Sequence, residues 1–243
     1  MTQFPENETG VLFDKLLHKF RHRKFAGFLL YIACVLYLSV PSFGLPVLEY
    51  GHLRISSFME QRALESSLLF YPQQSWVSLS DVNPNLLKSI VSMEDGKFFI
   101  HKGIDWEELE HSIKANKRKR KIARGGSTIT MQLSKNLFLR TDKNIFRKAK
   151  ELLISTRMEK EISKKALLAS YVNIIEWGNG IFGIDKASHV YYKKEPKILT
   201  LNECLRLVAV IPSPLEHQPT DNSSYVRFRS SVIRERYNDV ILP

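Results

Sequence analysis

The sequence is poor in the residues that hold small secreted domains and metal sites together. It contains two cysteines, Cys34 and Cys204, among 243 residues. Two cysteines exclude a fold built on several disulfides, and they cannot provide the four ligands of a structural zinc site. With 11 glycines, 10 prolines and no internal repeat, the chain is neither collagen-like nor of low complexity. Runs that alternate between apolar and polar residues are also scarce, so the pattern predicts few strands and a mainly helical fold.

Acidic residues are the minority among the charged ones. There are 25 of them against 36 lysines and arginines, which gives a formal net charge of +11 at pH 7. Such an excess favours an anionic partner, which could be nucleic acid, anionic lipid or a phosphorylated substrate. Hydrophobic residues make up 44% and aromatic residues 11%. This content supports a packed core, and the length fits one large domain or a domain with an appendage.

One long apolar run stands near the N-terminus. Residues 25–48 carry no charged side chain, and as a helix they would extend about 36 Å, enough to cross a bilayer core of about 30 Å. A cleaved signal peptide and a buried core helix are the alternatives. We expect a membrane anchor with a cytoplasmic N-terminus, which makes nucleic acid an unsuitable partner for the rest of the chain. The orientation follows from the positive-inside rule and the preceding basic cluster: Lys15, His18, Lys19, Arg21, His22, Arg23 and Lys24.

The predicted organisation is a cytoplasmic basic tail over residues 1–24, a transmembrane anchor over 25–48, a connector over 49–75 and a globular domain over 76–243. Apolar residues at helical spacing predict helices over 84–93, 105–116, 145–160, 164–175 and 200–211, and a glycine-rich turn over 177–183. Seven of the eleven residues from 114 to 124 are basic, which predicts a solvated loop or a loop at anionic lipid headgroups. The buried face of the helix over 145–160 is predicted to contain Ile145, Ala149, Leu152, Leu153 and Met158.

Three polar clusters are candidates for chemistry. In the first, over residues 94–105, Glu94 and Asp95 precede two phenylalanines, and a carboxylate beside aromatic rings can have a raised pKa and act as a general acid or base. The second, over 124–136, joins two glycines to hydroxyl, amide and ammonium donors that suit a phosphate or a sugar. The third sets Arg147 and Lys148 on the same side of a helix as Glu151. Each also has a plain structural interpretation: a solvated helix end, a polar surface loop and a surface ion pair.

Together, in this order and spacing, the clusters resemble the motifs of the peptidoglycan glycosyltransferases of glycosyltransferase family 51, in their monofunctional biosynthetic form. The resemblance covers about residues 75–240. The family's ED-x-x-F-x-x-H-x-G-x-D is matched at 94–105, its G-x-S-T-I-T-Q-Q-x-x-K-N at 125–136 and its R-K-x-x-E at 147–151. Two further motifs match over 171–184 and 211–214. Met131 in place of a glutamine and Lys143 in place of an arginine depart from the pattern, which affects substrate contacts more than activity.

The resemblance implies a mainly helical, lysozyme-like domain behind one transmembrane helix in the bacterial cytoplasmic membrane, with the catalytic domain on the outer side. It implies that lipid II, the acceptor, is joined to a growing glycan chain, the donor, through β-1,4 bonds, with inversion and release of undecaprenyl diphosphate. By resemblance Glu94 is the general base and Glu151 assists at the donor diphosphate. The substrate-binding residues that the resemblance implies are Asp95, Ser127, Thr128, Gln132, Lys135, Asn136, Lys143, Arg147 and Lys148.

The resemblance implies no metal-ligating side chains and no obligatory cofactor. A divalent cation, Mg²⁺ or Mn²⁺, at the donor diphosphate is left open, as are protein partners in cell division or wall synthesis. Because neither Ser-x-x-Lys nor Lys-Thr-Gly occurs in the sequence, we expect no transpeptidase activity. Two other functions remain as alternatives. A lysozyme-like enzyme that cuts glycan would not need the diphosphate-binding clusters, and a membrane-anchored scaffold that binds lipid II without turnover would need neither glutamate.

Overall fold

The structure is a computed structural model that describes residues 24–35, 38, 41, 45, 47–50, 55–66, 75–119, 125–141 and 144–243. The chain divides into two compact units, Met1–Val40 and Pro41–Pro243. In the first unit, residues 24–35 are helical. Among the described residues, no helix has both the length and the apolar character needed to span a bilayer. Two parts of the predicted N-terminal region lie outside the described residues. They are most of the basic tail and, within the anchor, positions 36, 37, 39, 40, 42–44 and 46.

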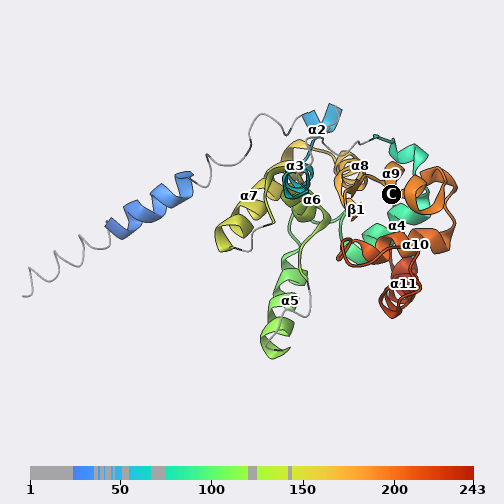
Figure 1. The fold of residues 1–243 in the computed structure, drawn as a ribbon. Coiled ribbons are helices and arrows are strands. Elements are labelled where there is room, and N and C mark those ends of the chain that lie inside the picture. The colour runs from blue at the N-terminus through green and yellow to red at the C-terminus, as the bar shows by residue number, and fades with distance from the viewer. Residues whose placement is uncertain are drawn as a thin grey trace, which may run out of the picture. The chain divides into compact units, whose positions relative to one another are not determined.

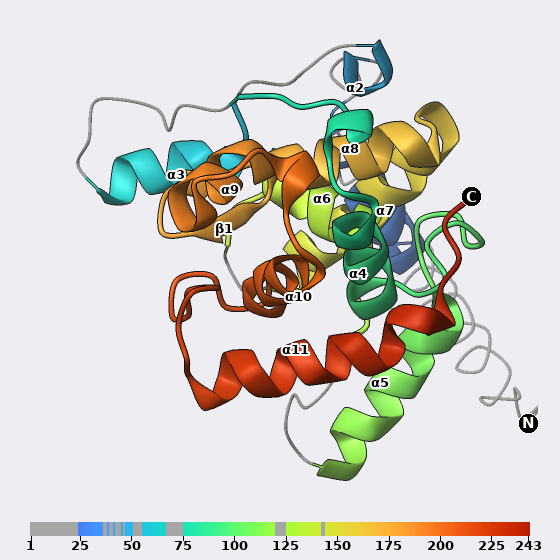
Figure 2. The ribbon, with the colours of Figure 1, turned by 90° about the vertical axis from the view of Figure 1, so that its right-hand side faces the viewer.

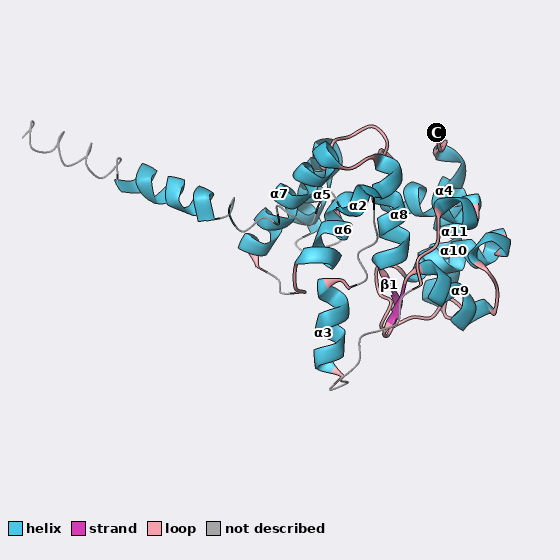
Figure 3. Ribbon diagram, turned by 90° about the horizontal axis from the view of Figure 1, so that it is seen from above, coloured by secondary structure: helices cyan, strands magenta, loops and turns pink. Residues whose placement is uncertain are grey.

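The second unit is mainly helical, as predicted (Figures 1 and 3). In the part of the chain that the structure describes, the only strands are β1 (Glu176–Gly178) and β2 (Ile181–Phe182), which pair antiparallel within the predicted glycine-rich turn. The described residues also form three short 3-10 helices, η1 (Leu79–Asp81), η2 (Pro196–Ile198) and η3 (Tyr237–Asp239). The α-helices are α2 (Val47–Tyr50), α3 (Ser57–Glu65), α4 (Pro84–Glu94), α5 (Trp106–Lys119), α6 (Ile129–Phe138), α7 (Ile145–Glu161), α8 (Lys164–Ile174), α9 (Ile184–Tyr192), α10 (Leu201–Val210) and α11 (Ser224–Arg236).

Five predicted helices are confirmed to within a few residues at each end, as α4, α5, α7, α8 and α10. Capping side chains set several of these ends: Asn83 caps α4, Ser163 caps α8, and Thr200 forms a capping box with Glu203 on α10. The helix α5 continues to Lys119, farther than predicted, so the first part of the basic stretch is helical. Residues 120–124 lie outside the described part.

The buried face of α7 differs from the prediction. Ile145 is 79% exposed and Leu153 is 40% exposed, whereas Glu151, Ile154 and Met158 are buried. Helical periodicity assigns a charged residue to the solvent face, but a carboxylate whose charge is paired can be buried. The buried face of α7 therefore contains an acidic residue in addition to the apolar Ile154 and Met158.

The segment predicted as a connector, residues 49–75, contains a helix that packs on the rest of the globular unit. Ser56 caps α3, which buries Phe58 and Met59 and packs on α6. From the same helix, Arg62 Nε lies 3.1 Å from both carboxylate oxygens of Glu176. This segment is too short to give a periodic apolar signal. Its burial was not predictable, because it depends on elements far along the chain.

The last residues of the predicted anchor also belong to the globular unit. Leu45 is fully buried and Leu48 is 3% exposed. The adjacent Glu49 accepts a hydrogen bond from the backbone N–H of Ser163, with 2.7 Å between Glu49 Oε2 and the nitrogen. These leucines are therefore covered by protein, and the globular unit begins before the predicted end of the anchor at residue 48.

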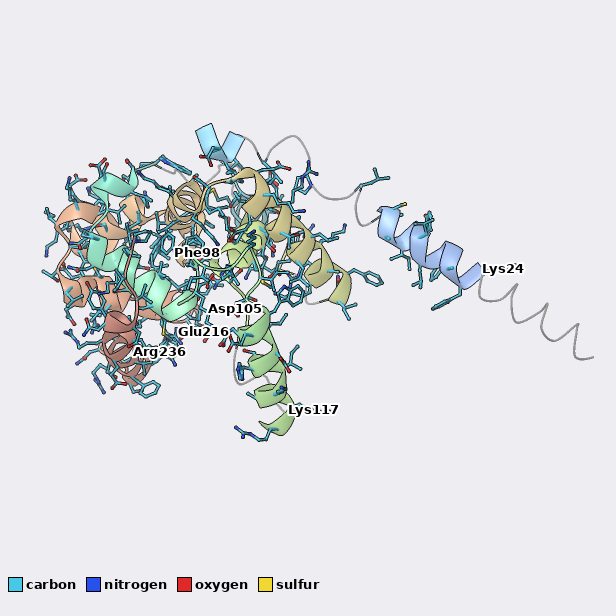
Figure 4. The ribbon with its side chains drawn as sticks, turned by 180° about the vertical axis from the view of Figure 1, so that it is seen from behind. Lys24, Phe98, Asp105, Lys117, Glu216 and Arg236 are labelled. Carbon is cyan, nitrogen blue, oxygen red and sulfur yellow. The ribbon has the colours of Figure 1, made fainter. Side chains whose placement is uncertain are left out.

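Two groups of helices frame the candidate site. In one, α10 packs on α4 and α11, and α11 also packs on α4; in the other, α6 packs on α7, α8 and α3 (Figure 2). The helix α5 leads away from both groups, running from near Asp105 past Lys117 (Figure 4). The C-terminal end of α4 brings Glu94 within reach of one side chain from α6, Gln132, and one from α11, Arg229.

Candidate active site

Glu94 is the last residue of α4, and it contacts both α6 and α11. Gln132 Nε2 donates a hydrogen bond to Glu94 Oε2 at 2.9 Å, and Arg229 Nη2 lies 3.8 Å from Oε1. The Glu94 side chain is 11% exposed. Burial raises the pKa of Glu94 above its ordinary value, Asp95 adds to the rise, and Gln132, Arg229 and Lys135 oppose it. A carboxylate with a raised pKa and one hydrogen-bonded oxygen suits a proton acceptor near neutral pH.

Tyr171, on α8, orients the amide that binds Glu94. Its hydroxyl donates to Gln132 Oε1 at 3.0 Å, and its side chain is fully buried. Because an amide accepts at one end and donates at the other, this bond directs the NH₂ end of Gln132 toward Glu94. Burial, together with Glu94 and Asp95, raises the pKa of Tyr171 well above its ordinary value. The hydroxyl therefore remains protonated and keeps donating.

Asp95 lies inside the protein. One of its oxygens accepts from the backbone N–H of Ile129 at 2.9 Å, at the first residue of α6, where a helix N-terminus favours negative charge. His101 Nε2 lies 2.9 Å from the same carboxylate, while His101 Nδ1 accepts from the Gly103 N–H at 3.1 Å. This second bond places the imidazole proton on Nε2, facing Asp95. Asp95 thus fixes the start of α6, and its substrate-binding role stays a prediction.

Thr128 has a similar structural place. It caps α6 by accepting from the Met131 N–H, and its hydroxyl donates to the Gly103 carbonyl oxygen at 2.7 Å. Gly103 has φ of +92°, and a side-chain carbon there would lie 3.0 Å from the Ser155 carbonyl oxygen. A glycine is therefore required where this loop passes α7. Thr128 is 3% exposed and holds the start of α6 against the Gly103 loop, and its substrate-binding role stays a prediction.

Glu151 is 2% exposed and is bound by two cations from its own helix. Arg147 Nη1 lies 2.6 Å from Oε2, and Lys148 Nζ lies 2.5 Å from Oε1. Lys148 also donates to Ser127 Oγ at 2.9 Å, which ties the glycine-rich segment to α7. Leaving a buried charge without a partner costs several kcal/mol, so this triad differs from the surface ion pair that the spacing alone allows. Two cations and one anion give the group a net charge of +1.

Lys135, on α6, lies in the electrostatic field of both glutamates. Burial lowers its pKa, Glu151 and Glu94 oppose that effect, and the two cations of α7 add to it. Its Nζ lies 5.4 Å from the centre of the Phe58 ring, so the ammonium contacts α3 as well. A partly desolvated ammonium between two carboxylates is well placed to bind an anion that approaches from the cleft.

A cleft of about 260 Å³ opens beside these side chains. Asn136 lines it and is 7% exposed. Gln132 and Lys135 belong both to the lining and to the surroundings of the glutamates, so they connect the cleft with Glu94 and Glu151. The lining comes from α3, α6, β1 and the segment after α10: Phe58, Arg62, Gln132, Lys135, Asn136, Ile175, Glu176 and Ile211–Glu216.

The structure therefore separates the residues that the sequence grouped together. Gln132, Lys135 and Asn136 line the cleft, Ser127, Arg147 and Lys148 surround Glu151, and Lys143 lies outside the described residues. Arg229, the Tyr171 hydroxyl and the Arg62–Glu176 pair were not predicted as site residues. A buried tyrosine within a matched motif offered a weak signal for Tyr171. The sequence offered no signal for Arg229, because α11 contains several arginines and the spacing of Arg229 does not distinguish it from the others.

One group among the described residues could offer three metal ligands. The ligand atoms of Asp185, His189 and Glu195 lie within 4.8 Å of one another. His189 already pairs with both carboxylates, at 3.4 Å from Asp185 and 3.3 Å from Glu195, and none of the three lines the cleft. At the candidate site, both oxygens of Glu151 bind side-chain cations, so this donor set does not fit a metal ion.

Comparison with known proteins identifies the family. Residues 61–238 match the transglycosylase family. The chain is 36% identical over 171 residues to a biosynthetic peptidoglycan transglycosylase of Chromobacterium violaceum, covering 70% of this chain and 75% of the relative. It is 37% identical over 190 residues to one of Haemophilus influenzae (76% and 79%), and 36% identical over 200 residues to one of Paraburkholderia xenovorans (81% and 83%). The chain therefore belongs to the transglycosylase family and is a glycosyltransferase of peptidoglycan synthesis.

Proposed function

We propose that this enzyme polymerises lipid II into β-1,4 glycan strands with inversion, releasing undecaprenyl diphosphate, and that it has no transpeptidase activity. The observation that carries the proposal is the contrast between two glutamates near one cleft. Glu94 is partly buried with one hydrogen-bonded oxygen and a raised pKa, whereas Glu151 is saturated by two cations. Carboxylates in such different environments take different roles.

In the proposed reaction Glu94 is the general base. It takes the proton from the 4-hydroxyl of the acceptor's GlcNAc, and the oxygen forms a bond to the anomeric carbon of the donor. The bond between that carbon and the α-linked diphosphate breaks, and its electron pair leaves with the diphosphate. Attack from the opposite face produces the β-linkage in one displacement, so no protein nucleophile is needed. General base catalysis of this kind contributes about 10²–10⁴-fold to the rate.

The basic side chains would stabilise the leaving diphosphate. Lys135 is partly desolvated, and Arg147 and Lys148 are held in place by Glu151. Fixed cations aimed at a developing negative charge act without reorganising during the reaction. Glu151 therefore works as a positioning carboxylate for these cations. A Mg²⁺ or Mn²⁺ ion would have to be held mainly by diphosphate oxygens, and no step here depends on one.

We further propose that residues 25–44 anchor the chain in the bacterial cytoplasmic membrane as a single pass, with the catalytic unit on the outer side. These twenty residues carry no charge, and as a helix they would extend about 30 Å, which matches a bilayer core. The boundary before Leu45 follows from the burial of Leu45 and Leu48 in the globular unit. Such an anchor suits substrates that are themselves held in the membrane by lipid tails. Partners in cell division or wall synthesis stay a prediction.

Incubation of the purified protein with labelled lipid II tests the function. Polymer that a muramidase digests to disaccharide units, formed by the wild type and not by Glu94→Gln, is the expected result. Shortening of added glycan strands would instead indicate a lytic enzyme. Binding of lipid II with no product from the wild type would indicate a scaffold. Either of these outcomes would overturn the proposal.

A further inference from the structure

Arg229 reaches Glu94 from α11, a helix that none of the recognised motifs includes. Ser223 caps α11, and the helix packs on both α4 and α10. Arg229 Nη2 lies 3.8 Å from Glu94 Oε1, and the side chains of Arg229 and Glu94 are 20% and 11% exposed. Two oppositely charged groups that are both largely withdrawn from water interact more strongly than an exposed pair.

The guanidinium is held in this place by two further contacts. Arg229 Nε donates to the Ala209 carbonyl oxygen at 3.0 Å, near the end of α10. Its Cζ lies 5.8 Å from the centre of the Tyr225 ring, which in turn stacks on His217 at 3.8 Å and 15°. These contacts restrict the rotamers of a long side chain before any substrate arrives, so little entropy remains to be lost at the site.

The two oxygens of Glu94 differ in their partners. Oε2 accepts the hydrogen bond from Gln132. For Oε1, the Arg229 contact at 3.8 Å is longer than a hydrogen bond, and no hydrogen bond to this oxygen is found among the described residues. Arg229 thus acts on Oε1 through its charge and leaves the oxygen's lone pairs available.

We propose that Arg229 is a positioning residue for the general base: it keeps Glu94 ionised and leaves Oε1 as the oxygen that takes the proton from the acceptor hydroxyl. This inference rests on the proposed function of Glu94. Direct hydrogen bonds to both oxygens would make the carboxylate a poorer base, whereas no cation at all would favour its neutral form. A cation just beyond hydrogen-bonding distance avoids both effects.

The other groups that act on Glu94 fit this assignment. Asp95 is its neighbour in sequence and disfavours ionisation, Lys135 on α6 favours it, and Arg229 is the cation that α11 supplies. Tyr171 on α8 and Tyr225 on α11 also sense the charge of Glu94, and both have a raised pKa, so they are neutral at pH 7. Removing Arg229 leaves Lys135 as the one remaining cation among these groups.

The pH dependence of kcat/KM on lipid II separates this role from a merely structural one. A general base must be ionised, so activity falls as the pH falls through its pKa. Without the Arg229 charge the pKa of Glu94 rises, and the acidic limb of the profile moves to higher pH. We expect Arg229→Gln to lose roughly 10–100-fold in rate at pH 7 and to show this displacement. Arg229→Lys, which keeps the charge, should restore the limb toward its wild-type position.

Three controls make the outcome decisive. Arg234→Gln removes an exposed arginine from the same helix and should leave the profile unchanged. Tyr225→Leu removes the ring beside the guanidinium but no charge, so it should move the acidic limb to higher pH by less than Arg229→Gln does. If Arg229→Gln fails to fold, Tyr225→Leu is compared with the wild type instead, and an acidic limb at the wild-type position would then overturn the inference. Circular dichroism and thermal unfolding check each variant. If Arg229→Gln folds and the acidic limb of its pH profile stays at the wild-type pH, the inference is overturned, whatever the rate of the variant.

Glu94→Gln separates failure of the inference from failure of the proposed function. An inactive Glu94→Gln together with an unmoved limb in Arg229→Gln would reject the role of Arg229 alone. Turnover by Glu94→Gln near the wild-type rate would reject Glu94 as the base, and the role of Arg229 would be rejected with it.

Discussion

Lys148→Ala distinguishes a structural ion pair from a catalytic cation. Removing one partner from a fully buried pair costs about 3–5 kcal/mol, because the remaining charge is left alone. Here Arg147 remains bound to Glu151, and the Lys148 side chain is 35% exposed, so water screens part of the loss. We therefore expect a loss of about 1–2 kcal/mol in the free energy of unfolding, or about 2–8 °C in Tm.

The expected effect on catalysis is larger. If Lys148 stabilises the leaving diphosphate mainly in the transition state, its removal should lower kcat by about 10²–10³-fold and change KM little. Initial rates of polymerisation over a range of labelled lipid II concentrations, measured beside thermal unfolding, give both quantities. Lys160→Ala is the matched control, since it removes an exposed lysine from the last turn of the same helix. A kcat for Lys148→Ala within about threefold of the wild type would refute the reasoning and leave the triad a structural feature.

Three other outcomes are expected. Glu94→Gln should lose about 10²–10⁴-fold in activity, while its Tm stays equal or rises: a pKa raised by burial means that ionised Glu94 opposes folding at pH 7. Tyr171→Phe, which frees the Gln132 amide to rotate, should lower kcat without unfolding the protein; unchanged kcat in the same polymerisation assay would argue against this orientation. Polymerisation should resist penicillin and be blocked by moenomycin, a donor mimic that the family resemblance implies as an inhibitor, and activity at saturating moenomycin would contradict the donor site.

Much of the site could be predicted because its chemistry depends on local spacing. Glu94 and the R-K-x-x-E triad are each contained in a few consecutive residues, and a helix places side chains four apart on the same side whatever surrounds it. The helix over residues 145–161 was predictable for the same reason, since it needs only its own periodicity and a capping asparagine at its start. Which side of that helix is buried was not predictable, because the burial of Glu151 depends on packing against other helices, α6 among them.

The roles within the motifs required the tertiary structure. Asp95 and Thr128 have the composition of ligand-binding residues, yet their oxygens bind the backbone at the start of α6 and at Gly103. A sequence records which donors and acceptors exist, and it does not record which of them the protein itself satisfies. Gln132 remains a site residue because its amide reaches Glu94 and the cleft from one side of α6.

The sequence by itself determined the helical class, the positions of α4, α5, α7, α8 and α10, the polar clusters and, through their order, the family. These features come from short-range geometry and from residues that lie close together in the chain. Only the tertiary structure decided that α3 and Leu45 belong to the globular unit, that Glu151 is buried, and that Arg229 faces Glu94. Each of these depends on packing between segments far apart in the chain, where the gain from burial and charge pairing exists only once both partners are in place.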